Sequence, residues 1–122
     1  MITVLMSVYN GEEYLRIAID GILNQTYNDF EFIIINDGST DQSRNIICSY
    51  TDKRIKLIDN DKNNGLIYSL NKGIENASGK YIARMDADDI SLPTRLQKQF
   101  DYLESNKHFA LVGSSAILID EL

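Results

Sequence analysis

Short apolar runs of strand length alternate along this chain with amphipathic stretches of helical period, and this alternation limits the fold more than any other feature. Between the apolar runs, hydrophobic residues recur about every four positions, as Tyr14, Ala18 and Ile22 do, which is typical of helices that cover a sheet. Strands that alternate with helices predict a three-layer α/β/α domain with a mostly parallel sheet. The runs that we expect to form strands are Ile2–Tyr9, Phe30–Asn36, Ile55–Asp59, Lys80–Asp86 and Phe109–Ile119.

End signals mark the helices between these strands. Ser39–Gln42 has the pattern of a capping box, and Asn10 with Glu13 resembles a second one. Gly79 is expected to close the helix that precedes the fourth strand, because glycine favours the position just after a helix. We see no linker or repeat, so the 122 residues are expected to form a single domain.

The charge balance narrows the classes of partner. A net charge of −6 argues against non-specific binding to nucleic acid or to anionic membrane, since both require a basic surface. The single cysteine excludes a disulfide within the chain. No apolar run approaches the length of a membrane span, and the N-terminus lacks the basic region of a signal peptide. We therefore expect a cytoplasmic location, although a longer parent chain would be able to attach to a membrane.

Polar clusters follow several of the expected strands. They are Ser7–Asn10 after the first strand, Asn36–Asp41 after the second and Asp86–Asp89 after the fourth. In open α/β sheets, ligands bind at the carboxyl ends of the strands, near the point where the strand order reverses. These clusters are therefore the candidate site.

The turns that open the first two helices do not look like phosphate-binding loops. The first contains one glycine and is followed by Glu12 and Glu13, and the second helix opens with Asp41. Acidic residues suit the positive end of a helix dipole but repel a phosphate group. A dinucleotide-binding, hydride-transferring enzyme is therefore disfavoured, and any phosphate ligand in this acidic site needs a cation.

Asp86 and Asp88 are the candidate ligands of that cation. One residue apart at a strand end, both carboxylates can turn toward the same small volume. Hard oxygen ligands select Mg²⁺ or Mn²⁺, which proteins often hold through one or two carboxylates plus the phosphates of a substrate. The alternative is a solvated acidic turn before a helix, with Asp89 near the start of that helix.

Other residues at the strand ends have two interpretations each. Asp37 is able to accept a hydrogen bond from a base N–H or a ribose hydroxyl, or it is a turn residue in the Asn-Asp-Gly-Ser sequence. Tyr9 would stack on a base, or it is simply the last residue of its strand. Arg84 and Lys72 are the basic residues expected nearest to the phosphates, or they are surface residues.

A phosphatase of the haloacid dehalogenase type is an enzymatic alternative, because its D-x-D motif also follows a strand. In that class the motif follows the first strand and has Thr or Val two positions after the second Asp. Here the first strand ends in Ser7–Asn10, and Asp88 is followed by Asp89 and Ile90, which disfavours this class.

Several ordered motifs together resemble the N-terminal, nucleotide-sugar-binding half of family 2 glycosyltransferases, which have the Rossmann-like GT-A fold. The matching segments are residues 7–41, which begin SVYNGEEYL and end INDGSTD, and residues 63–96, which include ARMDADD. The resemblance covers essentially the whole chain. It implies an inverting transfer of a sugar from a nucleotide-diphosphate sugar, commonly a UDP-sugar, to the hydroxyl of a glycan or lipid-linked acceptor, as in polysaccharide or cell-envelope synthesis.

Carried over by position, the resemblance implies a set of donor-binding residues. Ser7 and Tyr9 would lie at the base-binding edge, and Asp37 would accept the N3–H of uracil. Asn64 and Asn71 lie in a segment that the family places near the nucleotide.

The resemblance also implies a metal site and a missing catalytic group. Asp88 would bind the Mn²⁺ or Mg²⁺ that bridges the diphosphate, and Asp86 would approach the ribose or the metal. The general base is expected beyond Leu122, because Asp120 and Glu121 follow the fifth strand too closely to match it. The alternative class is a non-catalytic nucleotide-binding or interaction domain derived from the same fold.

Overall fold

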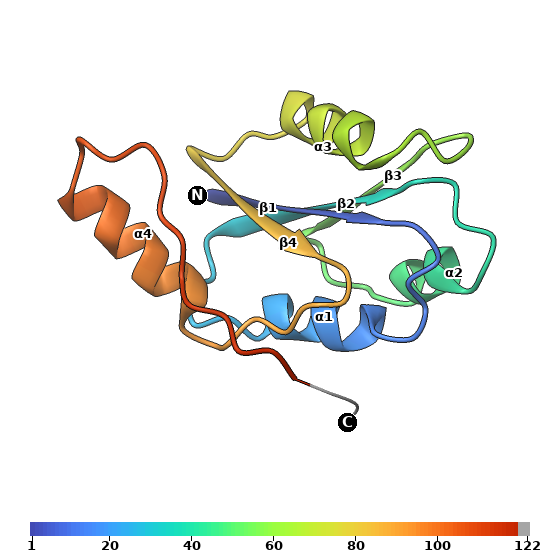
Figure 1. The fold of residues 1–122 in the computed structure, drawn as a ribbon, viewed down its shortest axis with the longest axis horizontal. Helices are drawn as coiled ribbons and strands as arrows, with labels where there is room; N and C mark the ends of the chain where they lie inside the picture. The colour runs from blue at the N-terminus through green and yellow to red at the C-terminus, as the bar shows by residue number, and fades with distance from the viewer. Residues whose placement is uncertain (120–122) are drawn as a thin grey trace.

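The computed structural model describes residues 1–119 as a three-layer α/β/α arrangement (Figure 1). Its strands are β1 (Ile2–Val8), β2 (Phe30–Asn36), β3 (Ile55–Asp59) and β4 (Tyr81–Asp86). Its helices are α1 (Leu15–Leu23), α2 (Ser43–Cys48), α3 (Leu66–Glu75) and α4 (Arg95–Ser105). Asp120 and Glu121 lie outside the described residues.

All neighbouring strands are parallel, in the order β3-β2-β1-β4. The chain therefore moves outward from β1 to β2 and β3, then returns to place β4 on the other side of β1. This reversal is the switch point near which α/β sheets bind ligands, and it lies between β1 and β4. The predicted three-layer fold with a parallel sheet is confirmed.

The two central strands, β1 and β2, are buried on both faces of the sheet, which explains their almost unbroken apolar runs. One face carries Val4, Met6 and Phe32, and it packs against α1, α2 and α4 in the larger core. The other face carries Leu5, Ile33 and Ile35, and it packs against α3. Figure 1 shows α3 alone on its side of the sheet.

The predicted fifth strand, Phe109–Ile119, is wrong for the described residues. Residues 110–119 form no strand, and Leu111 and Leu118 are 84% and 99% exposed. Its apolar composition favours a strand, but a strand also needs a backbone partner for its ladder. Along residues 110–119 the structure supplies no such partner.

The predicted helix caps are also wrong. α1 begins at Leu15 and α2 at Ser43, later than the two capping boxes require, and neither has a side-chain cap. α3 ends at Glu75, so Gly79 does not close it. Instead Gly79 lies against β1, where an added Cβ would be 2.3 Å from the backbone nitrogen of Thr3. Close backbone approach, rather than a helix end, therefore requires this glycine.

Candidate functional site

The candidate site lies at the carboxyl ends of β1, β2 and β4. In the register of the parallel sheet, Ser7 of β1 pairs with Asp86 of β4. Asp37 follows β2, and its backbone N–H donates to the Val8 carbonyl oxygen at 2.8 Å. Tyr9 extends from the end of β1 and is half exposed. The structure thus brings together the ends of the strands on both sides of the switch point, as the sequence predicted.

The loops that follow β1 and β2 cap each other. The side chain of Asn10 accepts a hydrogen bond from the Thr40 N–H at 2.8 Å, and Glu12 accepts one from the Gln42 N–H at 2.7 Å. In return, the Glu12 N–H donates to the carboxylate of Asp41 at 3.1 Å. The backbone N–H groups of Glu12, Thr40 and Gln42 are therefore already bound to side-chain oxygens, two of them carboxylates, and are not free to hold a phosphate. This geometry explains why neither loop is a phosphate cradle.

Asp37 is 2% exposed and accepts three hydrogen bonds. Its Oδ1 receives the Asn60 side-chain amide at 2.7 Å and the Asn64 N–H at 2.9 Å, and its Oδ2 receives the Gly65 N–H at 2.9 Å. Burial raises the pKa of this carboxyl, but the hydrogen bonds from Asn64, Asn60 and Gly65 outweigh burial and hold the pKa below its usual value. Asp37 is therefore an ionised, precisely oriented acceptor.

The loop from Asn60 to Gly65 covers Asp37 and packs against the turn after β2. A Cβ on Gly38, whose φ is +70°, would lie 2.4 Å from the carbonyl carbon of Lys62. Only glycine fits there, because both the positive φ and the close approach exclude a side chain. The Asn-Asp-Gly turn thus holds Asp37 and its covering loop in one rigid unit.

The sequence analysis missed Asn60 and the polar residues around it. Asn60 is 6% exposed and follows β3 directly, and its neighbour Asp59 accepts from Asn36 and pairs with Arg44. Asp59 and Asn60 are a polar pair at a strand end, like the clusters after the other strands. The same rule, applied to the third strand, would have found them.

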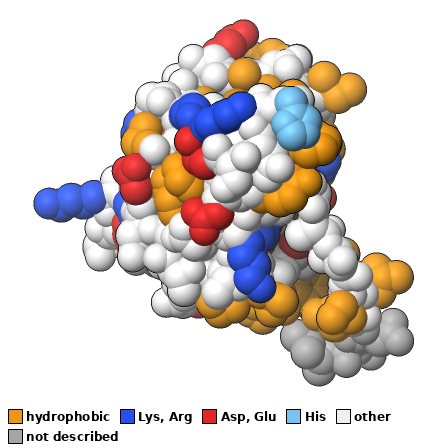
Figure 2. All heavy atoms as spheres, turned by 90° about the vertical axis from the view of Figure 1, so that its left-hand side faces the viewer, with side chains coloured by type: hydrophobic (Ala, Val, Ile, Leu, Met, Phe, Trp, Pro, Cys, Tyr) orange, Lys and Arg blue, Asp and Glu red, His pale blue; other side chains and the backbone are white. Residues whose placement is uncertain are grey.

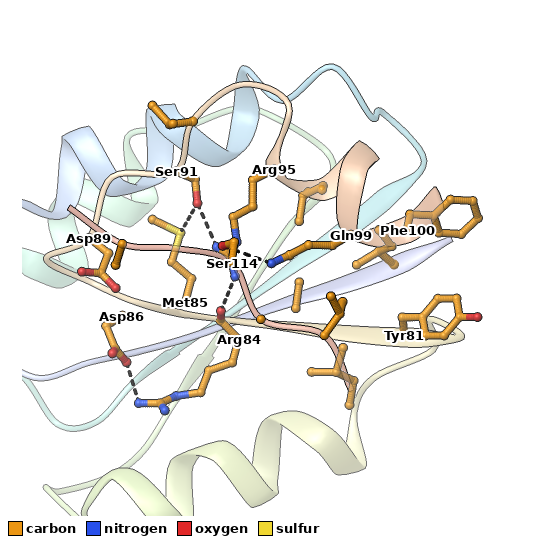
Figure 3. A pocket seen from close by; sticks show the side chains of 18 of the residues that line it. Tyr81, Arg84, Met85, Asp86, Asp89, Ser91, Arg95, Gln99, Phe100 and Ser114 are labelled. Atoms are coloured by element: carbon orange, nitrogen blue, oxygen red, sulfur yellow. Dashed lines mark hydrogen bonds and ion pairs between the residues drawn. The ribbon is translucent and has the colours of Figure 1, made fainter. Parts of the chain in front are cut away.

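Asp86 and Asp88 lie on the other side of β1. The carboxylate of Asp86 is about half exposed and pairs with Arg84, whose Nη2 lies 2.8 Å from Oδ1 (Figure 3). Asp88 is exposed. A Cβ on Gly11 would come within 3.8 Å of the Ala87 Cβ, so the turn after β1 lies against this acidic segment. The Arg84 expected near the phosphates is thus paired with a candidate metal ligand.

The acidic residues do not form a complete metal site by themselves. Within residues 1–119, no group of three or more His, Cys, Asp or Glu side chains is placed to hold a metal ion. Two accessible carboxylates do fit a Mg²⁺ or Mn²⁺ ion that takes its remaining ligands from phosphates and water. The arrangement suits a metal that arrives together with a diphosphate, rather than a preformed metal cage.

The remaining predicted residues lie around this edge. Asn64 is exposed, and its backbone N–H binds Asp37. Asn71 is exposed on α3. Its neighbour Lys72 is turned away from any open phosphate position, because its Nζ donates to the Asp59 carbonyl at 3.0 Å and to Asn60 Oδ1 at 2.8 Å. Lys72 therefore supports the covering loop instead of standing free at the site.

A groove of about 1080 Å³ runs from the acidic segment along β4 (Figure 3). It is bounded by β4, α4 and the unpaired segment 110–117, and its lining is largely apolar. Arg95 of α4 reaches back across it to the Arg84 carbonyl oxygen at 2.7 Å. Figure 2, which views the molecule from the left of Figure 1, shows hydrophobic side chains exposed among charged ones on this side.

No helix within residues 1–119 combines the length and the apolar character needed to cross a membrane.

A family model described as "Glycosyl transferase family 2" matches residues 3–120, nearly the entire chain. The chain belongs to this family. An uncharacterized glycosyltransferase of Haemophilus influenzae is 47% identical over 99% of this chain, and the putative glycosyltransferase EpsE of Bacillus subtilis is 42% identical over 98%. The chain spans 38% and 44% of those relatives, less than half of either.

Solved structures of low sequence identity show that this family 2 chain has the GT-A fold. Staphylococcus aureus TarS in complex with UDP matches with a TM-score of 0.81 at 24% identity, over 87% of this chain and 32% of TarS. A mannosyltransferase from Pyrobaculum calidifontis, in complex with GDP-Man and Mn²⁺, matches with a TM-score of 0.74 over 84% of this chain and 32% of its own. The predicted family and fold are both confirmed.

Proposed function

We propose that this chain is the donor-binding part of a longer glycosyltransferase that transfers a sugar from a nucleotide-diphosphate sugar, with UDP as the nucleotide. The observation that carries the proposal is the pairing of two different acidic features across the switch point. On one side Asp37 offers a buried, ionised acceptor, and on the other Asp86 and Asp88 offer exposed carboxylates. A nucleotide diphosphate needs a partner for its base and a metal for its phosphates, at opposite ends.

On this proposal, Asp37 accepts a hydrogen bond from the base, Tyr9 stacks on the base, and Ser7 lies beneath the nucleotide. Asn64 and Asn71 line the side formed by the loop before α3 and by α3 itself. The half-exposed ring of Tyr9 stands at the end of β1, where a flat ligand has access to it.

The proposed metal is Mg²⁺ or Mn²⁺, held by Asp88 with Asp86 beside it. When bound, such an ion neutralises the charge that grows on the diphosphate as it leaves the sugar. The protein's own contribution is to hold the two carboxylates one residue apart at the end of a rigid strand. Arg84 competes for Asp86, so metal binding requires this ion pair to open or to shift.

The proposed transfer inverts the anomeric carbon and needs a base on the opposite face of the sugar to deprotonate the acceptor hydroxyl. We assign this base to a part of the protein beyond Leu122. Relatives support a role in surface glycan synthesis. The O-antigen biosynthesis glycosyltransferase WbnJ of Escherichia coli is 42% identical over 99% of this chain and 48% of its own length. We infer a glycan or lipid-linked acceptor from this likeness.

Calorimetric titration of UDP into the protein, with and without Mn²⁺, tests the proposal. We expect binding that strengthens at least about tenfold when Mn²⁺ is present, and loss of this gain in Asp88→Ala. Asp101→Ala, which removes an exposed carboxylate of α4, is the matched control and should retain the gain. Equal Mn²⁺ dependence in wild type and Asp88→Ala would exclude the metal assignment, and absence of UDP binding would exclude the proposed donor.

A further inference from the structure

Arg95, the first residue of α4, joins the two sides of the acidic turn that carries Asp86 and Asp88. Its Nη2 donates to the Arg84 carbonyl oxygen at 2.7 Å, and its Nη1 donates to the Ser91 hydroxyl at 2.8 Å (Figure 3). Arg84 precedes the turn and Ser91 follows it. Because a guanidinium is planar and presents its donors in a rigid fork, these two bonds set the separation of the two acceptors.

The far side of the turn, at Ser91, is tied to α1. Ser91 is buried, and a Cβ on Gly21 of α1 would lie 3.4 Å from both its backbone nitrogen and its carbonyl oxygen. The next residue, Leu92, accepts a hydrogen bond from the side chain of Gln25 at 2.8 Å through its carbonyl oxygen. Arg95 therefore connects the end of β4 to a position that the rest of the fold holds in place.

The other bonds across the acidic turn are weaker than those of Arg95. The Asp89 N–H reaches the Asp86 carbonyl oxygen at 3.3 Å, which is longer than an ordinary backbone hydrogen bond. The Ser91 hydroxyl donates to the sulfur of Met85 at 3.3 Å, and a thioether is a weak acceptor. The guanidinium supplies shorter, charge-assisted bonds to the same two sides. The shape of the turn therefore depends on Arg95 more than on its own backbone.

Arg95 does not act as an ion-pair partner of the acidic residues. None of the ion pairs within residues 1–119 includes it, and both of its acceptors are uncharged oxygens. Burial lowers the pKa of Arg95, and the negative charge of Asp89 offsets this in part. Arginine stays charged in proteins, so Arg95 places a positive charge near the turn. By Coulomb's law this charge alone would oppose the binding of a second cation there.

We propose that Arg95 is a positioning residue that holds the turn from Asp86 to Asp88 in the shape that binds a divalent cation together with a diphosphate. In this role it contacts neither the cation nor the donor, and it acts through the Arg84 backbone and the Ser91 hydroxyl. The inference rests on the proposed function, and it names a residue of α4 that sets how strongly the metal supports donor binding.

Positioning and charge predict opposite results when the guanidinium is removed. If only its charge mattered, Arg95→Met would strengthen binding that depends on Mn²⁺, because a neighbouring positive charge is lost. If Arg95 positions the turn, the same change lets the two carboxylates adopt several arrangements, and binding that depends on Mn²⁺ weakens. Ser91→Ala keeps the charge and removes one of the two acceptors, so it weakens this binding only if positioning matters.

The test is calorimetric titration of UDP, with and without Mn²⁺, into wild type, Arg95→Met, Ser91→Ala and Lys98→Met. Lys98 is an exposed cation of α4 and serves as the matched control. We expect the gain in UDP affinity from Mn²⁺ to fall about three- to tenfold in Arg95→Met, to fall less in Ser91→Ala, and to stay unchanged in Lys98→Met. The UDP affinity without Mn²⁺ should stay the same in all four proteins, because the base is proposed to bind at Asp37, on the other side of β1.

The gain from Mn²⁺ separates positioning from stability. An unchanged or larger gain in Arg95→Met, with a cooperative thermal transition retained, would overturn the inference. So would an equal loss of UDP affinity with and without Mn²⁺, which a purely structural role would produce. If Arg95→Met does not fold, an unchanged gain in Ser91→Ala overturns the inference instead.

The wild-type titrations distinguish failure of this inference from failure of the proposed function. Wild-type protein that binds UDP more tightly with Mn²⁺ keeps the proposed function in place, whatever the variants show. Wild-type protein in which Mn²⁺ has no effect on UDP affinity would overturn both the proposed metal and this inference. Wild-type protein that binds no UDP would overturn the proposed donor as well.

Discussion

The two ends of β2 each carry a buried carboxylate, and their surroundings differ. Glu31, near the start of the strand, is 5% exposed and accepts hydrogen bonds from Thr3, Ser78 and Lys56, whose Nζ lies 2.6 Å from Oε2. Asp37, just after the end, is 2% exposed and has no lysine or arginine among its hydrogen-bond partners in residues 1–119. One carboxylate is paired with a cation, and the other is held by uncharged donors.

This difference separates a structural acid from a candidate binding acid. Glu31 joins β1, β3 and the turn before β4 at the amino ends of the strands, where open α/β sheets do not bind ligands. Burial raises the pKa of Glu31, but the hydrogen bonds from Lys56, Thr3 and Ser78 outweigh it and lower the pKa to about 2. Asp37 lies at the carboxyl ends of the strands, where a ligand is expected.

The largest expected effect is on stability at the Glu31 end. Glu31→Ala leaves the half-exposed Lys56 ammonium and the donors of Thr3 and Ser78 without their acceptor, which should cost roughly 2–3 kcal/mol of unfolding free energy. Urea titration followed by circular dichroism measures this loss. Glu75→Ala, which removes an exposed carboxylate of α3, should change the free energy by less than about 0.5 kcal/mol. A small effect of Glu31→Ala would show that the two carboxylates are not as different as the structure indicates.

The next effect is on the pH dependence of stability. Because the pKa of Glu31 falls from 4.5 in the unfolded chain to about 2 in the folded protein, its stabilisation is complete above pH 4.5 and is lost as the pH falls toward 2. The full contribution is about 3 kcal/mol. Urea titrations of wild type and Glu31→Gln between pH 7 and pH 2 should therefore converge below pH 4.5. If the unfolding free energies of wild type and Glu31→Gln differ by a constant amount across this pH range, the lowered pKa of Glu31 is contradicted.

At the other end of β2, Asp37→Asn should weaken nucleotide binding in addition to its effect on stability. The new amide N–H₂ faces the donors of Asn60, Asn64 or Gly65, and the base loses a charged acceptor. We expect UDP to bind about thirtyfold more weakly, which corresponds to a loss of about 2 kcal/mol of binding free energy. Glu31→Gln, the matched amide at the distant carboxylate, should leave the UDP affinity of the folded protein unchanged. If Asp37→Asn and Glu31→Gln lose UDP affinity equally, the loss reflects reduced stability and not a contact between Asp37 and the base.

The sequence alone predicted the acids at the carboxyl ends of the strands, but it did not predict the role of Glu31 at the amino ends. The acids after β2 and β4 stand out because they follow apolar runs directly, and Asp37, Asp86 and Asp88 were found in this way. Glu31 lies inside such a run and gives no sign in the sequence that its partners are Thr3 and Ser78, since those contacts depend on strand order. The strand pattern of Phe109–Ile119 misled the prediction for a related reason, because local composition does not show whether a backbone partner is present.

The smallest effect concerns the loops that cap each other at the binding end. Asn10 has a φ of 50° and accepts the Thr40 N–H through its side chain. Asn10→Gly keeps this backbone conformation and should lose only about 0.5–1 kcal/mol for the hydrogen bond. Asn10→Ala also strains the left-handed backbone and should cost about 1 kcal/mol more. The midpoints of thermal unfolding compare Asn10→Gly with Asn10→Ala. Equal midpoints would mean that the left-handed conformation has no energetic cost for alanine.

On the proposed function, a nucleotide and a metal bind together at the carboxyl ends of the strands. Nuclear magnetic resonance with Mn²⁺ tests it directly, since the ion broadens the signals of nearby amides. We expect Mn²⁺ with UDP to broaden the signals of Gly11 and Ala87, but not those of Ser78 and Gly79, which lie at the other end of the sheet about 20 Å away. Broadening that is independent of UDP, that persists in Asp88→Ala, or that extends equally to Ser78 would contradict it.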